Sequence, residues 1–357
     1  MAAVFERMSR FVGGLASGPL PLPTVATLPA AQCLPAGSAE IEIPRDAAYF
    51  TLRVNELHLT QGREIWATYD PMVMVTSTFI HGTEQITVPF VVGPSLLKEH
   101  AAVGVPHGVL IHDTTVAGPY PNRGGPVTIG IVLYRVKRDD YARKLLQVVE
   151  GVSAAIGPAA DMAVLSKVGG PMIDGLEALL GLGATVAIAG HRIEYDTMMQ
   201  GGLRSWYAAL INAPQVDQKS LRVEGARLMR STTDGMQPVR DADYVLYSLT
   251  GQARREDERT LPFYALYQRA LRDAASGTDE AWKAAKATLA ECWQQMAVSP
   301  DLTSGQAGAL IDGYRADLLA ARDRARKLSE LSVGQHSEVR DSREAARLTT
   351  ASALTDL

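Results

Sequence analysis

Cysteine is scarce in this chain, which has Cys33 and Cys292 among its 357 residues. The two lie far apart and neither belongs to a Cys-x-x-Cys pair. A disulfide framework and a structural zinc site of the usual spacing are therefore both excluded. We expect two reduced thiols in a cytoplasmic protein.

Long apolar runs are also missing. No uncharged apolar stretch of about 18 residues occurs, so no transmembrane helix is expected. The N-terminal segment 1–23 is interrupted by Gly13, Gly14 and several prolines. That pattern does not fit the unbroken apolar core of a secretory signal peptide. The chain is rich in Ala, Gly and Arg and poor in Phe and Ile, which is typical of a bacterial gene of high GC content.

A strong charge of either sign is absent as well. The formal net charge is −4 and the isoelectric point is about 6.0. Without a basic excess, nothing steers the whole molecule toward nucleic acid, so no nucleic-acid partner is predicted. A membrane partner is not favoured either, and the feature that allows it is the apolar segment 158–190 described below.

Cofactor and nucleophile motifs are missing too. The chain has no Gly-x-Ser-x-Gly nucleophile elbow and no Gly-x-x-x-x-Gly-Lys-Ser/Thr phosphate loop. Residues 181–190 begin with Gly-x-Gly, but they follow a predicted helix and precede a predicted strand, the reverse of a dinucleotide-binding turn. We predict no cofactor and no metal, and favour a protein that is not an enzyme.

The N-terminal part is predicted to be an amphipathic helix followed by a proline-rich arm. Apolar residues at helical spacing form one stripe over residues 1–16. A helix this short is unstable alone in water, so we expect it to dock on a protein surface through Phe5 and Phe11. Residues 17–39 lack periodicity and are predicted to form the arm.

Residues 40–137 are predicted to form a β domain. Phe50, Leu52 and Val54 alternate, and the phase then slips, which predicts a bulge near Asn55–Glu56. Strands are expected over 63–69, 72–80, 86–92 and 127–133, with a turn at 70–71. Pro89 predicts an edge position for its strand, and the Gly- and Pro-rich segment 93–126 is expected to be irregular.

Helical and β patterns alternate in the remainder of the chain. Residues 138–183 read as a helical insert, with a break or kink at Gly169–Pro171, and residues 184–251 as a second β region. Residues 252–331 form a predicted helical bundle, and 332–357 a disordered tail. The predicted fold is α+β: antiparallel sheets resembling a β-sandwich, a helical insertion at 139–182 and a C-terminal helical bundle. The second β region either completes the sandwich or forms a separate sheet.

Two groups of residues are candidates for chemistry. His107, His112 and Asp113 could ligate zinc or iron, or supply a base. A separation of five residues on a strand places the two histidines on opposite faces, so they remain weak catalytic candidates and no metal site is predicted. In the second group, the sequence GPYPNRGG at 118–125 indicates a turn or binding loop with Arg123, Gly124 and Gly125, and anion binding is the less favoured alternative, because no phosphate-loop pattern is present and a strand follows.

The apolar, small-residue segment 158–190 allows two interpretations. It is either a buried helical hairpin packed on a sheet or a membrane-active element held down in the resting state. The favoured function is a non-enzymatic binding, scaffold or regulatory protein that acts through a protein partner or self-assembly. The alternatives are a membrane-active effector released by proteolysis and a metal-assisted hydrolase around His107, His112 and Asp113.

Overall fold

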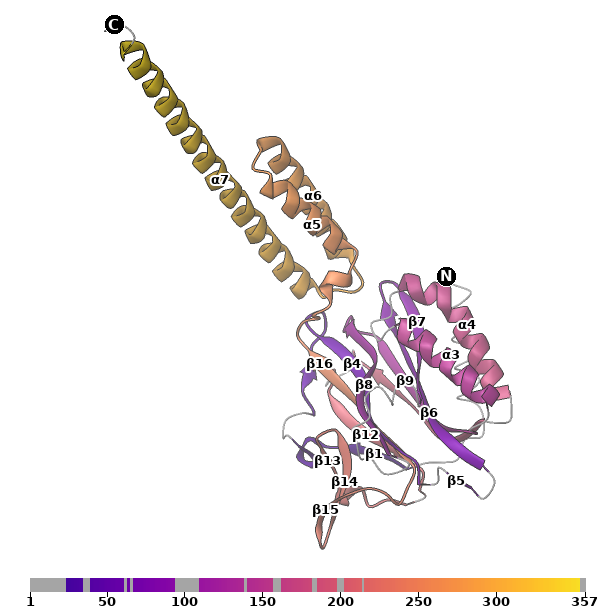
Figure 1. Ribbon diagram of the computed structural model, residues 1–357. Helices are drawn as coiled ribbons and strands as arrows, with labels where there is room; N and C mark the ends of the chain where they lie inside the picture. Colours follow the sequence, from indigo (N-terminus) through magenta and orange to yellow (C-terminus); the bar gives the residue numbers. More distant parts are fainter. Residues whose placement is uncertain are drawn as a thin grey trace. The chain divides into compact units, whose positions relative to one another are not determined.

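The computed structural model describes residues 24–34, 39–60, 63–64, 67–93, 109–137, 140–156, 162–181, 185–197, 202–213 and 215–353. The chain divides into two compact units, 1–255 and 256–357. In the described residues, the first unit contains the strands and the helices α3 and α4, and the second is helical (Figure 1). The α+β class predicted from the sequence is confirmed.

Two five-stranded sheets form the body of the first unit. One has the order β1-β12-β16-β4-β8, and the other has the order β10-β9-β6-β5 with β7 also paired to β6. Every pairing within these sheets is antiparallel. The strands of the first sheet are β1 (Thr24–Leu28), β12 (Trp206–Ile211), β16 (Tyr244–Gln252), β4 (Tyr49–His58) and β8 (Val109–Pro121). Those of the second are β10 (Thr185–Asp196), β9 (Pro126–Lys137), β6 (Ala67–His81), β5 (Arg63–Glu64) and β7 (Glu84–Val92).

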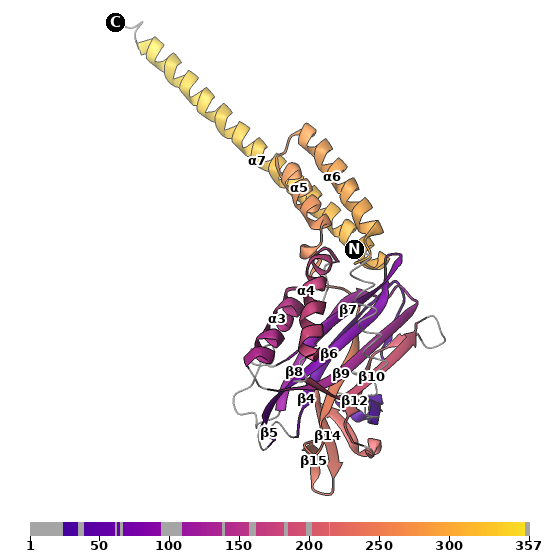
Figure 2. The same ribbon diagram turned by 90° about the vertical axis from the view of Figure 1, so that its right-hand side faces the viewer.

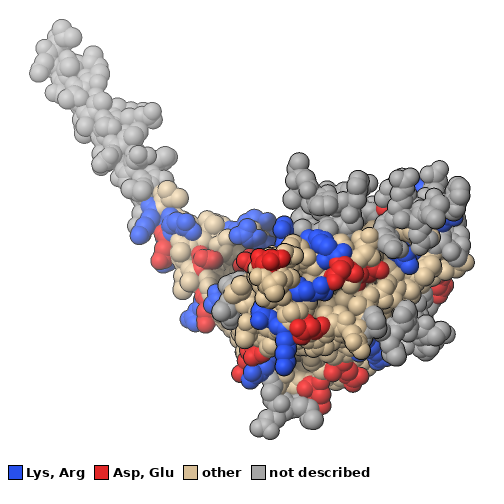
Figure 3. Space-filling view, turned by 90° about the horizontal axis from the view of Figure 1, so that it is seen from below, with Lys and Arg blue, Asp and Glu red and all other residues tan. Residues whose placement is uncertain are grey.

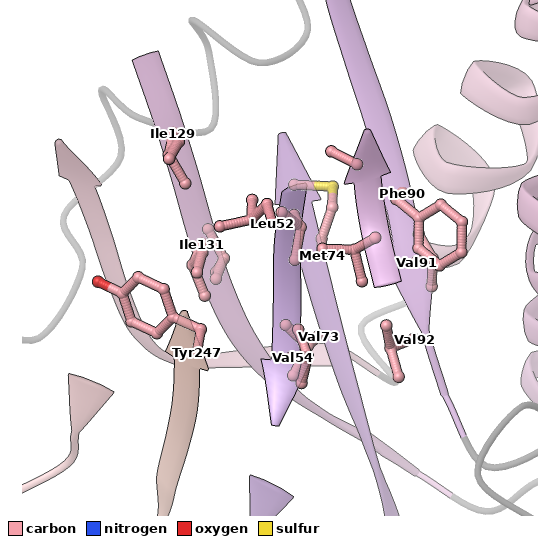
Figure 4. Packing of buried hydrophobic residues seen from close by; sticks show 14 of the residues in the cluster. Leu52, Val54, Val73, Met74, Phe90, Val91, Val92, Ile129, Ile131 and Tyr247 are labelled. Carbon is pink, nitrogen blue, oxygen red and sulfur yellow. The ribbon is translucent and has the colours of Figure 1, made fainter. Parts of the chain in front are cut away.

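The main core lies between these two sheets, as in a β-sandwich. Leu52 and Val54 of β4 approach Val73 of β6 and Ile131 of β9, with Tyr247 of β16 beside them (Figure 4). Strands from both predicted β regions contribute to each of these two sheets: β10, β12 and β16 of residues 184–251 complete the sandwich, and residues 221–238 form strands of a further small sheet.

Two helices cover the outer face of the second sheet. They are α3 (Asp140–Ile156) and α4 (Met162–Gly181), which lie side by side next to β7, β6 and β9 (Figure 2). A Cβ atom on Gly175 of α4 would lie 2.8 Å from Val149 of α3, so the two helices approach closely. Helix α4 runs on through Pro171. The predicted break there is wrong, because the buried residues that follow the proline hold the helix against the sheet.

A small third sheet packs on the outer face of the first. Its order is β15-β14-β13-β2, and its strands are β2 (Cys33–Leu34), β13 (Leu221–Glu224), β14 (Arg227–Thr232) and β15 (Gly235–Pro238). Leu221 and Leu228 pack there with Tyr244 and Leu246 of β16. Because β1 and β2 lie within the predicted proline-rich arm, the arm has more regular structure than its composition indicated.

Several local predictions can be compared with the strands. The bulge in β4 is confirmed, because the register shifts between Val54 and Glu56. The edge position of β7 is confirmed among the described strands, since β7 pairs with β6 alone. The turn at Asp70–Pro71 is wrong, because β6 runs through it. Pairing with β7 begins only at Val73, so Pro71 needs no backbone donor on that side.

The irregular segment predicted over 93–126 is also wrong for its second half. Residues 109–121 form β8, which pairs with β4 through a ladder with three register shifts. In the order of the described strands β8 lies at the end of its sheet, where proline is tolerated because one side of the strand needs no ladder. Residues 94–108 lie outside the part that the structure describes.

The second unit is built from α5 (Phe263–Ala275), α6 (Asp279–Val298) and α7 (Ser304–Ala353). Their shared core contains Tyr267, Cys292 and Tyr314, and the two tyrosine rings stack with centroids 3.7 Å apart. We expected disorder from residue 332, but α7 continues as a helix to Ala353. Residues 332–353 contain many good helix formers, such as Ala, Arg and Glu, which explains the difference.

Candidate functional site

The histidine and phenylalanine candidates fall mainly outside the described residues. Phe5, Phe11 and His107 belong to segments that the structure does not describe, and His112 is placed as part of β8 without a described side chain. The docking of Phe5 and Phe11, and any joint role of His107 and His112, therefore stay predictions.

Asp113, the third member of the histidine cluster, forms an ion pair on the outer face of the first sheet. Its Oδ2 pairs with Nη1 of Arg53, and its Oδ1 accepts a hydrogen bond of 2.8 Å from Nδ2 of Asn55. Both partners come from the neighbouring strand β4. This arrangement fixes the carboxylate across two strands, which is a structural role.

Two properties of the described residues bear on the alternative functions. No group of three or more His, Cys, Asp and Glu side chains is placed to hold a metal ion among the residues that the structure describes. None of the helices in that part of the chain is both long and apolar enough to cross a membrane.

The predicted binding loop at 118–125 forms a corner between the sheets. Strand β8 belongs to one sheet and β9 to the other, so residues 122–125 carry the chain across the sandwich. Asn122 is buried and organises this corner. Its backbone N–H donates to Ala48 O at 2.9 Å, and its carbonyl accepts from Asp46 N–H at 2.7 Å. Its side-chain Nδ2 donates to Ile43 O at 2.7 Å.

The two glycines of the loop are required by its backbone. Gly124 and Gly125 have φ values of 85° and 83°, a left-handed region that favours glycine. A Cβ on Gly125 would also lie 2.4 Å from Ile80 Cδ1. The Gly125 carbonyl accepts a hydrogen bond of 2.8 Å from the Thr197 hydroxyl, which ties the end of β10 to the corner. The glycines thus shape the loop and set its position.

A cavity of about 390 Å³ opens at this corner, and we call it the corner cavity. Its volume falls in the range of small-ligand sites. Part of its wall is a short ribbon in which β3 (Glu42–Ile43) pairs with β11 (Leu203–Arg204). The described lining residues are Glu42, Ile43, Pro44, Arg45, Asn122, Thr197, Gly202, Leu203 and Arg204.

The charges at the corner cavity differ from those predicted. Arg45 and Arg204 line it together with one acid, Glu42, which lies opposite Arg204 in the ribbon. Arg45 is also paired, because its Nε lies 3.3 Å from Asp46 Oδ2. Arg123 is not among the lining residues, and its Nη1 lies 3.4 Å from Asp46 Oδ1. Gly124 and Gly125 are not among the described lining residues either, so the binding role predicted for Arg123, Gly124 and Gly125 stays a prediction.

Elsewhere on the first unit the charges are mixed. On the face drawn in Figure 3, basic and acidic side chains are interspersed among uncharged ones, without a broad area of one sign. A charged partner of this face would therefore be recognised through local pairs of groups.

His191 is half-buried on β10, and its ring reaches the other sheet of the sandwich. His191 of β10 has Nδ1 3.3 Å from the hydroxyl of Tyr247 in β16, so the contact joins the two sheets. Burial lowers the pKa of His191, because desolvation disfavours the imidazolium ion. The folded unit therefore holds this imidazole in its neutral form at neutral pH.

A pH dependence of stability follows from that lowered pKa. As the pH falls through the ordinary imidazole pKa of about 6.5, the unfolded chain binds a proton that the folded chain does not. The free energy of unfolding should therefore decrease between pH 7 and pH 5. His191→Gln should make this decrease smaller, as measured by urea unfolding at several pH values. Above pH 7.5 the two proteins should show parallel curves, and equal slopes below pH 7 would contradict the assignment.

Comparison with known proteins gives no relative to guide the interpretation. No protein-family model matches the chain, and no curated protein matches it either. The functional argument therefore rests on the residues themselves.

Proposed function

We propose that the chain is a non-enzymatic binding or scaffold protein that acts through protein partners, and that the corner cavity accepts an acidic side chain of such a partner. The observation that carries this proposal is the presence of Arg45 and Arg204 in the wall of one cavity of about 390 Å³. That volume suits a side chain or a short peptide segment.

The chemistry of the lining supports an acidic ligand. A guanidinium group binds a carboxylate through two parallel hydrogen bonds, which are stronger than bonds between neutral groups. Asn122 and Thr197 add neutral polar groups to the wall, and Glu42 would repel a second carboxylate from its side. We infer a ligand with one carboxylate placed near the arginines, rather than a dense polyanion.

The same lining favours binding over catalysis. Its described residues include no histidine or cysteine, and Glu42 is the acid among them. The backbone network around Asn122 holds the wall in place before a ligand arrives, which lowers the entropic cost of binding.

The alternative functions receive less support from the described residues. Met172, Ile173, Leu176 and Leu179 of α4 are buried in the hydrophobic cluster that joins the helices to the sheets. Asp113, the acid of the hydrolase hypothesis, is engaged by Arg53 and Asn55. We further propose that the protein acts in a bacterial cytoplasm, supported by two free, buried cysteines in separate hydrophobic clusters.

Binding of an acidic peptide tests the proposed function. A fluorescein-labelled peptide with a single glutamate in a Ser/Gly sequence should bind the full chain more tightly than its glutamine counterpart in a polarisation assay. Arg204→Gln should weaken binding of the glutamate peptide about tenfold or more, because it removes a charge-assisted hydrogen bond.

The matched control is Arg192→Gln, an exposed arginine of β10 that is not among the described lining residues. This variant should retain wild-type affinity for the glutamate peptide. Equal affinity of the wild-type chain for both peptides, or equal losses in the two arginine variants, would reject the corner cavity as the binding site.

A further inference from the structure

Strand β10 forms one edge of the second sheet. It has 12 residues, and among the described strands it pairs with β9 alone. Figure 2 shows it beyond β9, at the end of the order β7, β6, β9 and β10. An edge strand presents a row of backbone N–H and C=O groups that can pair with a further strand. Strand β10 is therefore a candidate for pairing by strand addition.

The other edges of the two large sheets carry features that oppose such pairing. Strand β7 contains Pro89, which cannot donate to a further ladder. Strand β8 contains Pro119 and Pro121, and its ladder with β4 has three register shifts. Strands β1 and β5 have only five and two residues. Because β10 contains no proline, it is the one long strand open to pairing among the described edges of these sheets.

The second half of β10 is the regular part of this edge. Its register against β9 shifts between Ala187 and Ala189 and then runs without a break to Asp196. Ile193, in the middle of this part, packs against the main core but is only half-buried, as expected for an edge position. The backbone of residues 189–196 therefore offers a regular ladder to a further strand.

The exposed charges of this stretch complement one another across a symmetric pair. Arg192 and Glu194 are exposed, and their separation of two residues places them on the same face of the sheet. In an antiparallel pair of identical strands centred on Ile193, Arg192 stands opposite Glu194 of the second copy. Glu194 then stands opposite Arg192 of the second copy, so two cross-strand ion pairs form about one two-fold axis.

Neighbouring registers lose this match. A pair centred on Arg192 or on Glu194 places two identical charges directly opposite each other, which is destabilising. A pair centred between two residues places a charged side chain opposite one that faces the core of the sandwich. The charges therefore select the register centred on Ile193.

We propose that two copies of this chain associate through β10, as antiparallel strands centred on Ile193, and thereby join their second sheets into one continuous sheet. The pairing goes beyond the proposed function and does not depend on it, because Arg192 and Glu194 are not among the described residues that line the corner cavity. Its contacts are backbone hydrogen bonds and two ion pairs, with little apolar surface, so the association is reversible and concentration-dependent.

The oligomeric state of the full chain tests this pairing. Sedimentation equilibrium at high micromolar concentration should show a dimer for the wild type. Arg192→Glu should raise the dissociation constant about tenfold or more, because both ion pairs become pairs of like charge. Combining Arg192→Glu with Glu194→Arg should restore the wild-type constant, which a folding defect would not allow. A wild-type monomer, an unaffected Arg192→Glu dimer, or a double exchange that does not recover association would overturn the proposal.

Glu84→Arg is the matched control for Glu194→Arg. Glu84 is exposed and begins β7 in the same sheet, and its replacement changes the net charge by the same amount. Glu84→Arg should leave the dissociation constant of the dimer unchanged, whereas Glu194→Arg should raise it about tenfold or more. Equal losses in the two variants would indicate a general effect of charge and contradict pairing through β10.

Hydrogen exchange locates the contact. Alternate backbone amides of residues 190–196 point away from β9 and should exchange quickly in a dilute sample. At high micromolar concentration these amides should become protected in the wild type and in the double exchange, but not in Arg192→Glu. The amides of β7 should show no dependence on concentration. A dimer that forms without new protection in β10 would overturn the proposed interface.

Discussion

Leu176→Asp is expected to lower the free energy of unfolding of the sandwich unit by about 4 kcal/mol or more, enough to prevent folding of many variant molecules. Leu176 lies on α4, is 0% exposed, and belongs to the cluster that joins the helices to the sheets. A carboxylate there would lose its hydration, and the packed leucine would be lost as well. Insolubility or a strongly lowered melting temperature in a thermal unfolding experiment is the expected result.

Ala178→Asp provides the matched control on the same helix. Ala178 is exposed, two residues from Leu176, so the new carboxylate stays in water. Its cost should be within about 1 kcal/mol, which mainly reflects the lower helix propensity of aspartate. A stable, monodisperse Leu176→Asp protein would instead support the hypothesis that this segment leaves its protein contacts during function.

Glu56→Ala is expected to destabilise the sandwich unit by about 3 kcal/mol, because it breaks a buried ionic contact and leaves a backbone donor without its acceptor. Glu56 is 0% exposed, and its Oε2 accepts a hydrogen bond of 2.6 Å from the backbone N–H of Leu228. Its Oε1 lies 3.5 Å from Nη1 of Arg240. This carboxylate therefore anchors the small sheet to β4, and urea unfolding should show the loss.

Hydrogen exchange gives a local measure of the same effect. In Glu56→Ala the backbone amides of β13 and β14 should exchange faster than in the wild type, since their link to β4 is cut. Asp113→Ala is the control on the same face, where the ion pair with Arg53 is largely exposed. Exposed pairs contribute about 1 kcal/mol or less. Equal effects of the two variants would contradict the anchoring role of Glu56.

The spacing of apolar residues in the sequence predicted the elements that have one buried face and one exposed face. After Val54 the apolar residues shift by one position in their alternation. An extra residue in a bulge produces this shift and returns the following apolar side chains to the buried face, so the pattern predicted the bulge in β4. Pro89 predicted the edge position of β7, because proline cannot donate to a second ladder. These features depend on local backbone chemistry, which a single sequence contains.

The wrong predictions share a different physical cause. Segment 109–121 lies next to the glycine- and proline-rich residues 118–126, but its first half is rich in Val, Ile and Thr, and it pairs with β4 as a strand. Residues 332–353 have the polar composition of a disordered segment, yet they continue a helix that the bundle has already started. In both cases the residues themselves favour the observed element, and pairing with a neighbouring strand or extension of an existing helix adds to that preference.

The sequence by itself determined the α+β class, the helical insertion and the C-terminal helices, because each depends on residue spacing within a short stretch. The tertiary structure alone decided the corner cavity. Arg45 and Arg204 are far apart in the chain, and they meet because β3 pairs with β11 and because Asn122 binds the backbone at Ile43. Such long-range pairing leaves no local pattern, since its free energy comes from contacts that exist only after the sheets have formed.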